Sequence, residues 1–103
     1  MIKMIASLKI KFKIKMPKVH RNSGKVESYS GEKLREGIVR TCRAVLTPLA
    51  AAERFAEEVE KRVSESISEH ATVTSRDVKR LAKNALSIYH PDAAEVYALE
   101  EAF

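Results

Sequence analysis

Three basic side chains lie close to a short turn signal in the first third of this 103-residue sequence. Arg21 and Lys25 flank Asn22-Ser23-Gly24, residue types that favour a tight turn, and Lys33 follows where a helix is predicted to begin. The start of a helix has unpaired backbone N–H groups and the positive end of the helix dipole, so it attracts anions, phosphate above all. The residues therefore predict an anion-binding pocket. The simpler alternative is an ordinary hairpin and helix with solvated lysines.

Two short strands and a capped helix must position these side chains. Residues 19–21 suit a strand, and residues 25–29 suit the strand that returns from the turn. Ser30 is a suitable N-cap because its hydroxyl can accept from a backbone N–H two or three residues on, and Glu32 places a carboxylate in the positive first turn. The helix is predicted from apolar positions that recur at helical spacing, namely Leu34, Ile38, Cys42, Val45 and Leu46.

The stretch from Val19 to Leu34 resembles the opening signature of the ATP-cone. This small nucleotide-binding module is found at the front of many ribonucleotide reductases and in the repressor of their genes. The family typically reads V-x-K-R-D-G-x-x-E-x-F-D-x-x-K-L. The positions that match without a gap are Val19, Arg21, Gly24, Glu27, Tyr29 for the aromatic residue, Lys33 and Leu34. Three positions depart from the pattern, because Asn22 replaces the second basic residue, Ser23 the acid of the turn and Ser30 the residue after the aromatic.

The resemblance continues more weakly downstream. Residues 73–78 resemble the family's short strand and the cap of its third long helix, and residues 94–97 resemble its final helix. The likeness thus covers roughly residues 19–103. Where the family often places phosphate-binding basic residues, near the end of the last helix, this sequence has Glu100 and Glu101.

The resemblance implies a base-binding part of a nucleotide site. Val19, Tyr29 and Leu34 would wall a purine, and the carboxylate of Glu27 would accept a hydrogen bond from an exocyclic amine. Each residue also has a simpler role. The three apolar side chains can fill the junction of hairpin and helix, and Glu27 can be a solvated strand carboxylate.

The resemblance also implies a phosphate-binding part. Arg21 and Lys33 would meet phosphates, whereas Lys25 falls on a variable position of the family. Ser75 and Lys79 match places where the third helix of the family contributes near the sugar and phosphates, although a helix cap and a surface lysine are the alternatives. The full predicted nucleotide-binding set is Val19, Arg21, Asn22, Glu27, Tyr29, Ser30, Lys33, Leu34, Ser75 and Lys79.

Charge is distributed unevenly along the chain. The net charge is +5, but residues 1–22 hold seven Lys and Arg and no acid, while the remaining 81 residues hold twelve against fourteen Asp and Glu. A slightly acidic body gives little support to a broad duplex-binding face. The alternation of apolar residues and lysines over 8–16 predicts a half-buried strand, which is either a basic ribbon for nucleic acid or a sheet edge protected by its lysines. We therefore expect a basic extension over 1–15 and one domain over 16–103, with Met1 or Met16 as the natural start.

Three further helices are predicted after the first. Thr47 is expected to cap the second helix, with Pro48 as its first residue and an apolar stripe of Leu49, Ala52, Phe55, Ala56, Val59, Val63 and Ile67. A loop over 68–72 and a short strand at Val73 follow. Ser75 is expected to cap the third helix, whose buried stripe is Val78, Leu81, Ala82, Ala85, Leu86 and Tyr89. His90-Pro91 ends that helix, and Pro91 opens the last one.

Catalytic and metal chemistry have little support in the sequence. The histidines His20, His70 and His90 are far apart and have no partner at metal-ligand spacing. Cys42 is expected to be a small buried hydrophobe in a reducing compartment. Neither a Walker loop nor a dinucleotide-binding glycine pattern is present, and no apolar run approaches the length of a membrane span. These observations predict a cytoplasmic protein that is not an enzyme.

Together the patterns predict an ATP-cone-like α+β domain in which a small three-stranded sheet caps a four-helix bundle. Its predicted function is to bind ATP or dATP reversibly, with or without Mg, as an effector, without a redox cofactor. It would signal occupancy through self-association or a protein partner, for which the last helix offers apolar side chains. Two alternatives remain: a nucleic-acid-binding protein that uses the N-terminal lysines, and a degenerate cone that acts only as a protein-interaction module.

Overall fold

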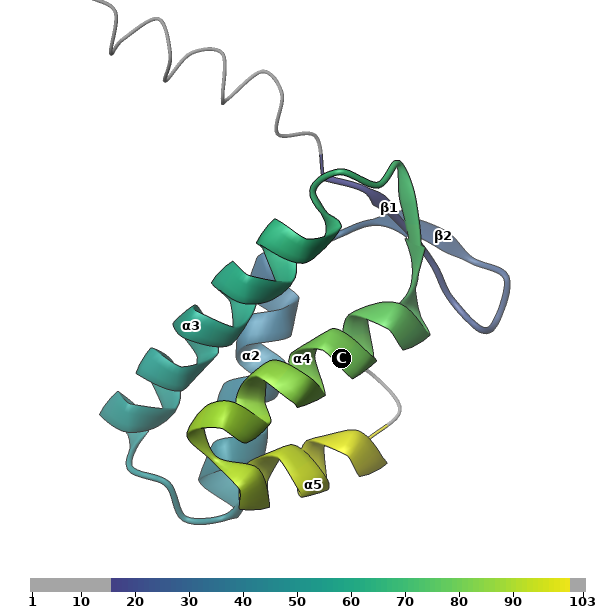
Figure 1. Ribbon diagram of the computed structural model, residues 1–103. Helices are drawn as coiled ribbons and strands as arrows, with labels where there is room; N and C mark the ends of the chain where they lie inside the picture. Colours follow the sequence, from purple (N-terminus) through teal and green to yellow (C-terminus); the bar gives the residue numbers. More distant parts are fainter. Residues whose placement is uncertain (1–15, 101–103) are drawn as a thin grey trace, which may run out of the picture.

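The computed structural model describes residues 16–100, so nearly all of the strand predicted over 8–16 lies outside the described range. A three-stranded sheet sits at one end of four helices, which is the α+β architecture predicted from the sequence (Figure 1). The elements in chain order are β1 (Lys18–His20), β2 (Val26–Ser28), α2 (Gly31–Ala44), α3 (Leu49–Ile67), β3 (Thr72–Thr74), α4 (Ser75–Tyr89) and α5 (Pro91–Leu99).

The sheet has β1 at its centre. β1 pairs antiparallel with β2 and parallel with β3, so Val19 lies opposite Glu27 on one side and Val73 on the other. The N–H of Arg21 donates to the carbonyl of Lys25 at 2.8 Å and closes the hairpin. Gly24 has a φ of +91°, a conformation that glycine adopts without steric cost. The predicted hairpin is confirmed.

The register of β1 with β3 determines where the helices start relative to the hairpin. His20 is aligned with Thr74 in the parallel pair. The next residues along the chain, Arg21 and Ser75, therefore leave the sheet at the same edge. As a result, the hairpin turn and the N-terminus of α4 are neighbours in space although more than fifty residues separate them in the sequence.

The hydrophobic core lies between the helices and the inner face of the sheet. α2 packs on α3, α3 on α4, and α4 on α5, while α5 also returns to contact α2. Most of the predicted apolar stripes are buried. The core residues are Val19, Tyr29, Leu34, Ile38, Cys42, Ala52, Ala56, Val59, Val63, Ile67, Val73, Val78, Ala82, Ala85, Leu86, Ala93, Ala94 and Tyr97.

The end of α2 differs from its prediction. The helix stops at Ala44, and Leu46 has a φ of 66° and a relative exposure of 90%, so its inclusion in the apolar stripe was wrong. The N–H of Leu46 donates to the carbonyl of Arg43, and that of Thr47 donates to Cys42. This pair of bonds is a Schellman motif, which turns the chain through a left-handed residue and directs the Leu46 side chain away from the helix face.

Two predicted caps are displaced by one residue. Thr47 does not cap α3: Pro48 occupies the N-cap position, the helix begins at Leu49, and the Thr47 hydroxyl lies 2.8 Å from His90 Nε2. Thr74, not Ser75, caps α4, because it is the last residue with extended backbone and β3 leads into the helix without a loop. The predicted cap of α2 and the predicted start of α5 are confirmed, since Ser30 accepts from the N–H of Lys33 and α5 begins at Pro91.

The cap of α4 is a capping box that can be tested by substitution. The Thr74 hydroxyl accepts from the N–H of Asp77 at 3.0 Å, and the Asp77 carboxylate accepts from the N–H of Thr74 at 3.3 Å. We expect Thr74→Ala to lower the free energy of unfolding by about 1 kcal/mol, the usual cost of losing such a cap. The neighbouring Ser75→Ala should change it by less than about 0.5 kcal/mol, since Ser75 makes no cap bond. Urea denaturation of both variants measures the difference, and equal losses would contradict this assignment.

Candidate functional site

Arg21, Glu27 and Lys33 form a charged group beside the hairpin. Arg21 Nη2 lies 3.2 Å from Glu27 Oε1, and Lys33 Nζ lies 3.8 Å from the same oxygen. Glu27 sits in β2 and Arg21 directly follows β1, so the hairpin brings these two together. Lys33 reaches them from the first turn of α2, which Ser30 caps. The structure thus joins three of the predicted site residues in one contact.

The charges of this group hold its carboxylate in the ionised form. The hydrogen bond from Arg21 is the largest cause that lowers the pKa of Glu27, and the positive charges of Arg21, Lys33 and Lys25 add to it, while burial acts in the opposite direction. A carboxylate that stays ionised is a strong acceptor for N–H donors. The carboxylate of Glu27 can therefore accept a hydrogen bond from an amine, while Arg21 and Lys33 can donate hydrogen bonds to an anion.

The three apolar site residues lie in the core behind this group. Val19 and Leu34 are fully buried, and Tyr29 is nearly so. The Tyr29 hydroxyl lies 3.4 Å from Ser64 Oγ, and burial raises its pKa. Ser64 in turn donates to Glu60 at 2.5 Å. These residues join the hairpin to α2 and α3, so they have a structural role, and the purine wall stays a prediction.

The remaining polar site residues lie around the charged group. Asn22 is exposed in the turn, and the oxygen of Ser30 accepts from the N–H of Lys33 at 3.2 Å. Ser75 is the first residue of α4 and lies at the same sheet edge as Arg21. Backbone donors at the start of α4 thus face the same edge as the basic side chains.

Lys79 belongs to a second group, one turn into α4. Its Nζ lies 4.1 Å from the ring centroid of Tyr97, a cation–π contact with α5. Burial is the largest cause that lowers the pKa of Lys79, the carboxylate of Glu100 raises it, and the positive charge of Arg40 lowers it further. Lys79 is therefore a half-buried cation held between α4 and α5, and not the simple surface lysine that was its alternative.

Glu100 extends this second group to α2. Its Oε2 accepts from the hydroxyl of Thr41 at 2.9 Å, and its Oε1 lies 3.6 Å from Arg40 Nη2. Thr41 is fully buried, and so is Tyr97. Burial and the nearby charge of Glu100 both raise the pKa of Tyr97. The carboxylate at the end of α5 is thus held by two groups of α2, close to Lys79 and Tyr97.

The sequence analysis missed Arg40, Thr41 and Tyr97. A signal for the first two was available, because Lys33, Gly37 and Arg40 are spaced three to four residues apart on α2 and so share one face of the helix. Gly37 is buried on that face. Tyr97 gave no such signal, since the sequence indicates only an apolar residue of the last helix, and the structure buries it.

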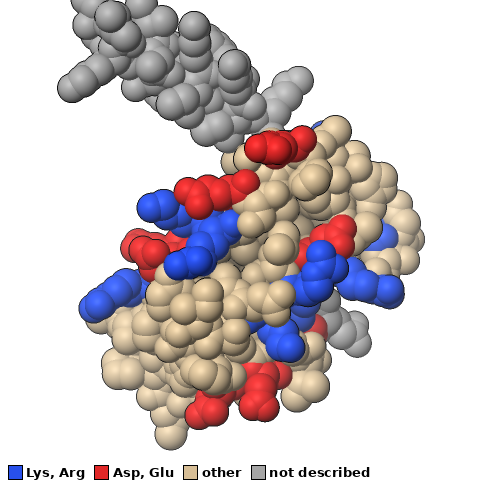
Figure 2. All heavy atoms as spheres, viewed as in Figure 1, with Lys and Arg blue, Asp and Glu red and all other residues tan. Residues whose placement is uncertain are grey.

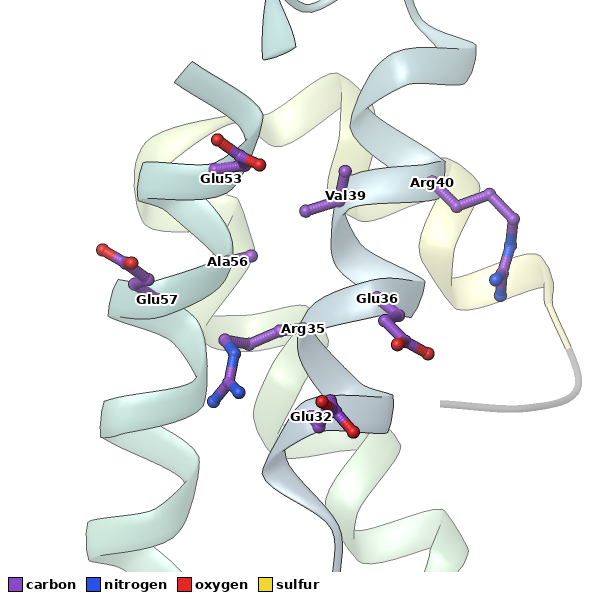
Figure 3. A pocket seen from close by; sticks show the side chains of 8 residues that line it. All are labelled: Glu32, Arg35, Glu36, Val39, Arg40, Glu53, Ala56 and Glu57. Atoms are coloured by element: carbon purple, nitrogen blue, oxygen red, sulfur yellow. The ribbon is translucent and has the colours of Figure 1, made fainter. Parts of the chain in front are cut away.

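A separate groove of about 600 Å³ lies between α2 and α3 (Figure 3). Its lining residues are Glu32, Arg35, Glu36, Val39, Arg40, Glu53, Ala56 and Glu57. Arg35 is paired with Glu60 at 3.0 Å, and Arg40 is paired with Glu100. The four glutamates of the lining form no ion pair within residues 16–100. A groove with this excess of carboxylates repels phosphate, so it is not the site that the sequence predicts.

Other kinds of site receive no support from the described part of the chain. Figure 2 shows Lys and Arg interspersed with Asp and Glu, without one broad basic patch on the face that it presents. Residues 16–100 contain no group of three or more His, Cys, Asp or Glu side chains that could hold a metal ion. None of the helices described is long and apolar enough to cross a membrane.

Comparison with known proteins identifies the family of the chain. The family model of the ATP cone domain matches residues 17–100, which include both charged groups. No curated protein and no solved structure matches the chain. ATP-cones are nucleotide-binding regulatory modules rather than catalytic domains. Since the match spans most of the sequence and the observed fold agrees with it, this chain belongs to the ATP-cone family.

Proposed function

We propose that this ATP-cone binds ATP or dATP reversibly at the edge of the sheet where the hairpin and α4 meet. The observation that carries the proposal is the convergence of Arg21 and Lys33 on the carboxylate of Glu27. Both cations are at least partly exposed, with side-chain exposures of 21% and 64%. The contact is therefore within reach of a ligand from solvent.

An adenine nucleotide has the groups needed to replace this contact. Its exocyclic amine donates to the ionised carboxylate of Glu27, and its phosphates accept from Arg21 and Lys33. Each partner of the ion pair thus gains a new partner when the pair separates. A ligand with phosphates but without an amine would leave Glu27 unsatisfied, and guanine presents a carbonyl oxygen where adenine has its 6-amine, so the proposed site favours adenine.

The start of α4 supplies the other side of the proposed site. Ser75 and the first backbone N–H groups of α4 lie at the edge that Arg21 occupies, and Lys79 follows one turn later. Helix N-termini favour phosphate. Asn22 stands where the family has a second basic residue, so the phosphate charge is balanced by Arg21, Lys33 and Lys79 in this chain. Mg would accompany the nucleotide as its own counter-ion.

The proposed output is a change in association, with the chain itself or with a partner protein. A nucleotide that binds one conformation or oligomer more tightly shifts the population toward it. The exposed apolar residue near the end of α5 is Leu99, with a relative exposure of 85%, whereas Tyr97 is buried and takes no part in such a surface. We place this function in the cytoplasm, a reducing compartment that suits the buried thiol of Cys42.

A second candidate function is nucleic-acid binding by the N-terminal segment. Residues 1–15 contain five lysines and no acid, which is the observation that favours it. Figure 2 shows mixed charges on the face that it presents, so that face offers no broad basic patch for this candidate. A third possibility is a cone that no longer binds a nucleotide and serves only as an interaction module. Calorimetric titration with nucleotides distinguishes this possibility from the proposal.

Nucleotide binding is tested by calorimetric titration with ATP, dATP and GTP. We expect Arg21→Ala and Lys33→Ala each to weaken ATP or dATP binding by about 1.5–3 kcal/mol, the value of a hydrogen bond to a charged group. Lys25→Ala is the matched control, because Lys25 is an exposed residue of the same hairpin that falls on a variable position of the family, and we expect it to change the affinity little. Absence of heat and of a thermal shift with millimolar ATP or dATP would reject the proposal and leave the interaction module.

The proposed output predicts a nucleotide-dependent molecular mass. A coupling of about 1–3 kcal/mol is enough to change an association constant five-fold or more, so sedimentation at micromolar protein should give different masses with and without nucleotide. Leu99→Glu should abolish the difference. Ile88→Glu, at another exposed apolar position with a relative exposure of 63%, should leave it in place. Equal masses despite tight nucleotide binding would direct the search to a separate partner protein.

The N-terminal segment and the nucleotide site are predicted to be independent. Deletion of residues 1–15 removes five lysines but none of the proposed site residues, so we expect unchanged nucleotide affinity. If the second candidate function holds, the same deletion abolishes binding to a duplex oligonucleotide at low salt. A large loss of helicity on deletion would show instead that the apolar residues of the segment belong to the core.

A further inference from the structure

The carboxylate of Glu100 is placed where an anion is surrounded by donors. The Thr41 hydroxyl donates to one of its oxygens at 2.9 Å, and Arg40 lies 3.6 Å from the other. In Figure 3 the Arg40 side chain extends away from α3 and on the side of α2 that α5 approaches. Lys79, on α4, lies with its Nζ over the ring of Tyr97, and the charges of Glu100 and Arg40 both affect its pKa. Arg40 thus pairs with the carboxylate, and Lys79 adds a second positive charge nearby.

Tyr97 adds a hydroxyl beside this group that Glu100 does not satisfy. The hydroxyl of Tyr97 is buried and has no hydrogen-bond partner within the described residues, although a buried hydroxyl without a partner is costly. The ammonium group of Lys79 also lies over the ring of Tyr97. An anion with more oxygens and more charge than a carboxylate would use this set of groups more fully, and a phosphate has both properties.

The position of this group connects it to the proposed nucleotide site. Lys79 belongs to both, and Arg40 lies on the same face of α2 as Lys33, seven residues and so about 10 Å further along the axis. One nucleotide can span that distance.

We propose that Arg40, Thr41 and Lys79 form a phosphate subsite in which the Glu100 carboxylate is a replaceable occupant. This inference rests on the proposed nucleotide binding, and it identifies Glu100 as a residue that controls the nucleotide affinity. Binding of a phosphate displaces Glu100, and the hydroxyl of Thr41 transfers its hydrogen bond from the carboxylate to a phosphate oxygen. Glu100 therefore competes with the ligand and lowers its affinity.

Displacement of Glu100 also releases the end of α5. Glu100 is the C-cap residue of α5, and its contacts to Arg40 and Thr41 tie this helix end to α2. Leu99, the exposed apolar residue, is its immediate neighbour. Occupancy of the subsite is thereby transmitted to the part of the surface whose association the nucleotide is proposed to control.

The test compares Glu100→Gln with the wild type in titrations with inorganic tripolyphosphate and with ATP, and a GTP titration of both proteins measures their base selectivity. Glu100→Gln keeps the side-chain size but removes the competing charge, so we expect both ligands to bind about three- to ten-fold more tightly. Glu95→Gln is the matched control, because it makes the same change at an exposed position of the same helix and should leave both affinities unchanged. Arg40→Gln, which leaves the Thr41 contact to Glu100 in place, should weaken both ligands.

Each outcome separates this inference from the proposed function. If the wild type binds ATP but Glu100→Gln binds it no more tightly, the subsite is rejected while nucleotide binding stands. If Glu100→Gln gains affinity for tripolyphosphate but neither protein prefers ATP over GTP, the subsite stands and adenine recognition is rejected. If neither protein binds any of these anions, both are rejected. Circular dichroism of each variant confirms that the fold is retained, and a variant that loses the fold is replaced by Glu100→Ala.

Discussion

The pairing of the central strand β1 with a neighbour on each side is the constraint on which this molecule depends. Three residues of β1 determine the position of the hairpin through β2 and the position of α4 through β3. Val19, at the middle of the strand, is fully buried and anchors the sheet to the helices. Because the strands are so short, a shift of one residue in either register would turn Val19 toward solvent and separate Arg21 from the start of α4.

A common feature of the two charged groups is that a carboxylate already lies among the cations. Glu27 forms ion pairs with Arg21 and Lys33, and Glu100 forms an ion pair with Arg40. Such contacts keep basic side chains in position without the repulsion that a cluster of unpaired cations would cause. The affinity of a ligand at either group then depends on the contacts that the ligand makes with the cations minus the contacts that the carboxylate loses. This difference makes the affinity sensitive to the geometry of the ligand.

Local rules predicted the hairpin and most of the helices because their signals lie within a few residues of each other. The turn residues 22–24 and the Ser30 cap are of this kind. The errors arose where two residues compete for one role. Thr74 and Ser75 are both good caps, and the choice between them follows from the length of β3, which a long-range pairing sets. Leu46 fitted the helical spacing, but its backbone lies in the turn that ends α2.

The candidate site was predicted in part for the same reason. Arg21, Glu27 and Lys33 lie within one continuous motif, and the structure brings them together. Lys79 and Tyr97 meet only because α4 and α5 pack against each other, so their contact has no local signal. The placement of Glu100 against Thr41 spans 59 residues of sequence and depends on the return of α5 to α2.

His90 links two corners of the bundle that are remote in the sequence. Its Nδ1 accepts from the N–H of Ala93 at the start of α5, and its Nε2 lies 2.8 Å from the Thr47 hydroxyl at the corner between α2 and α3. Because Nδ1 is an acceptor, the ring hydrogen is on Nε2 and donates to Thr47. Opening either corner breaks the bond between Thr47 and His90. We therefore expect local unfolding at the end of the bundle away from the sheet to be cooperative, with the amide hydrogens of the two corners exchanging together.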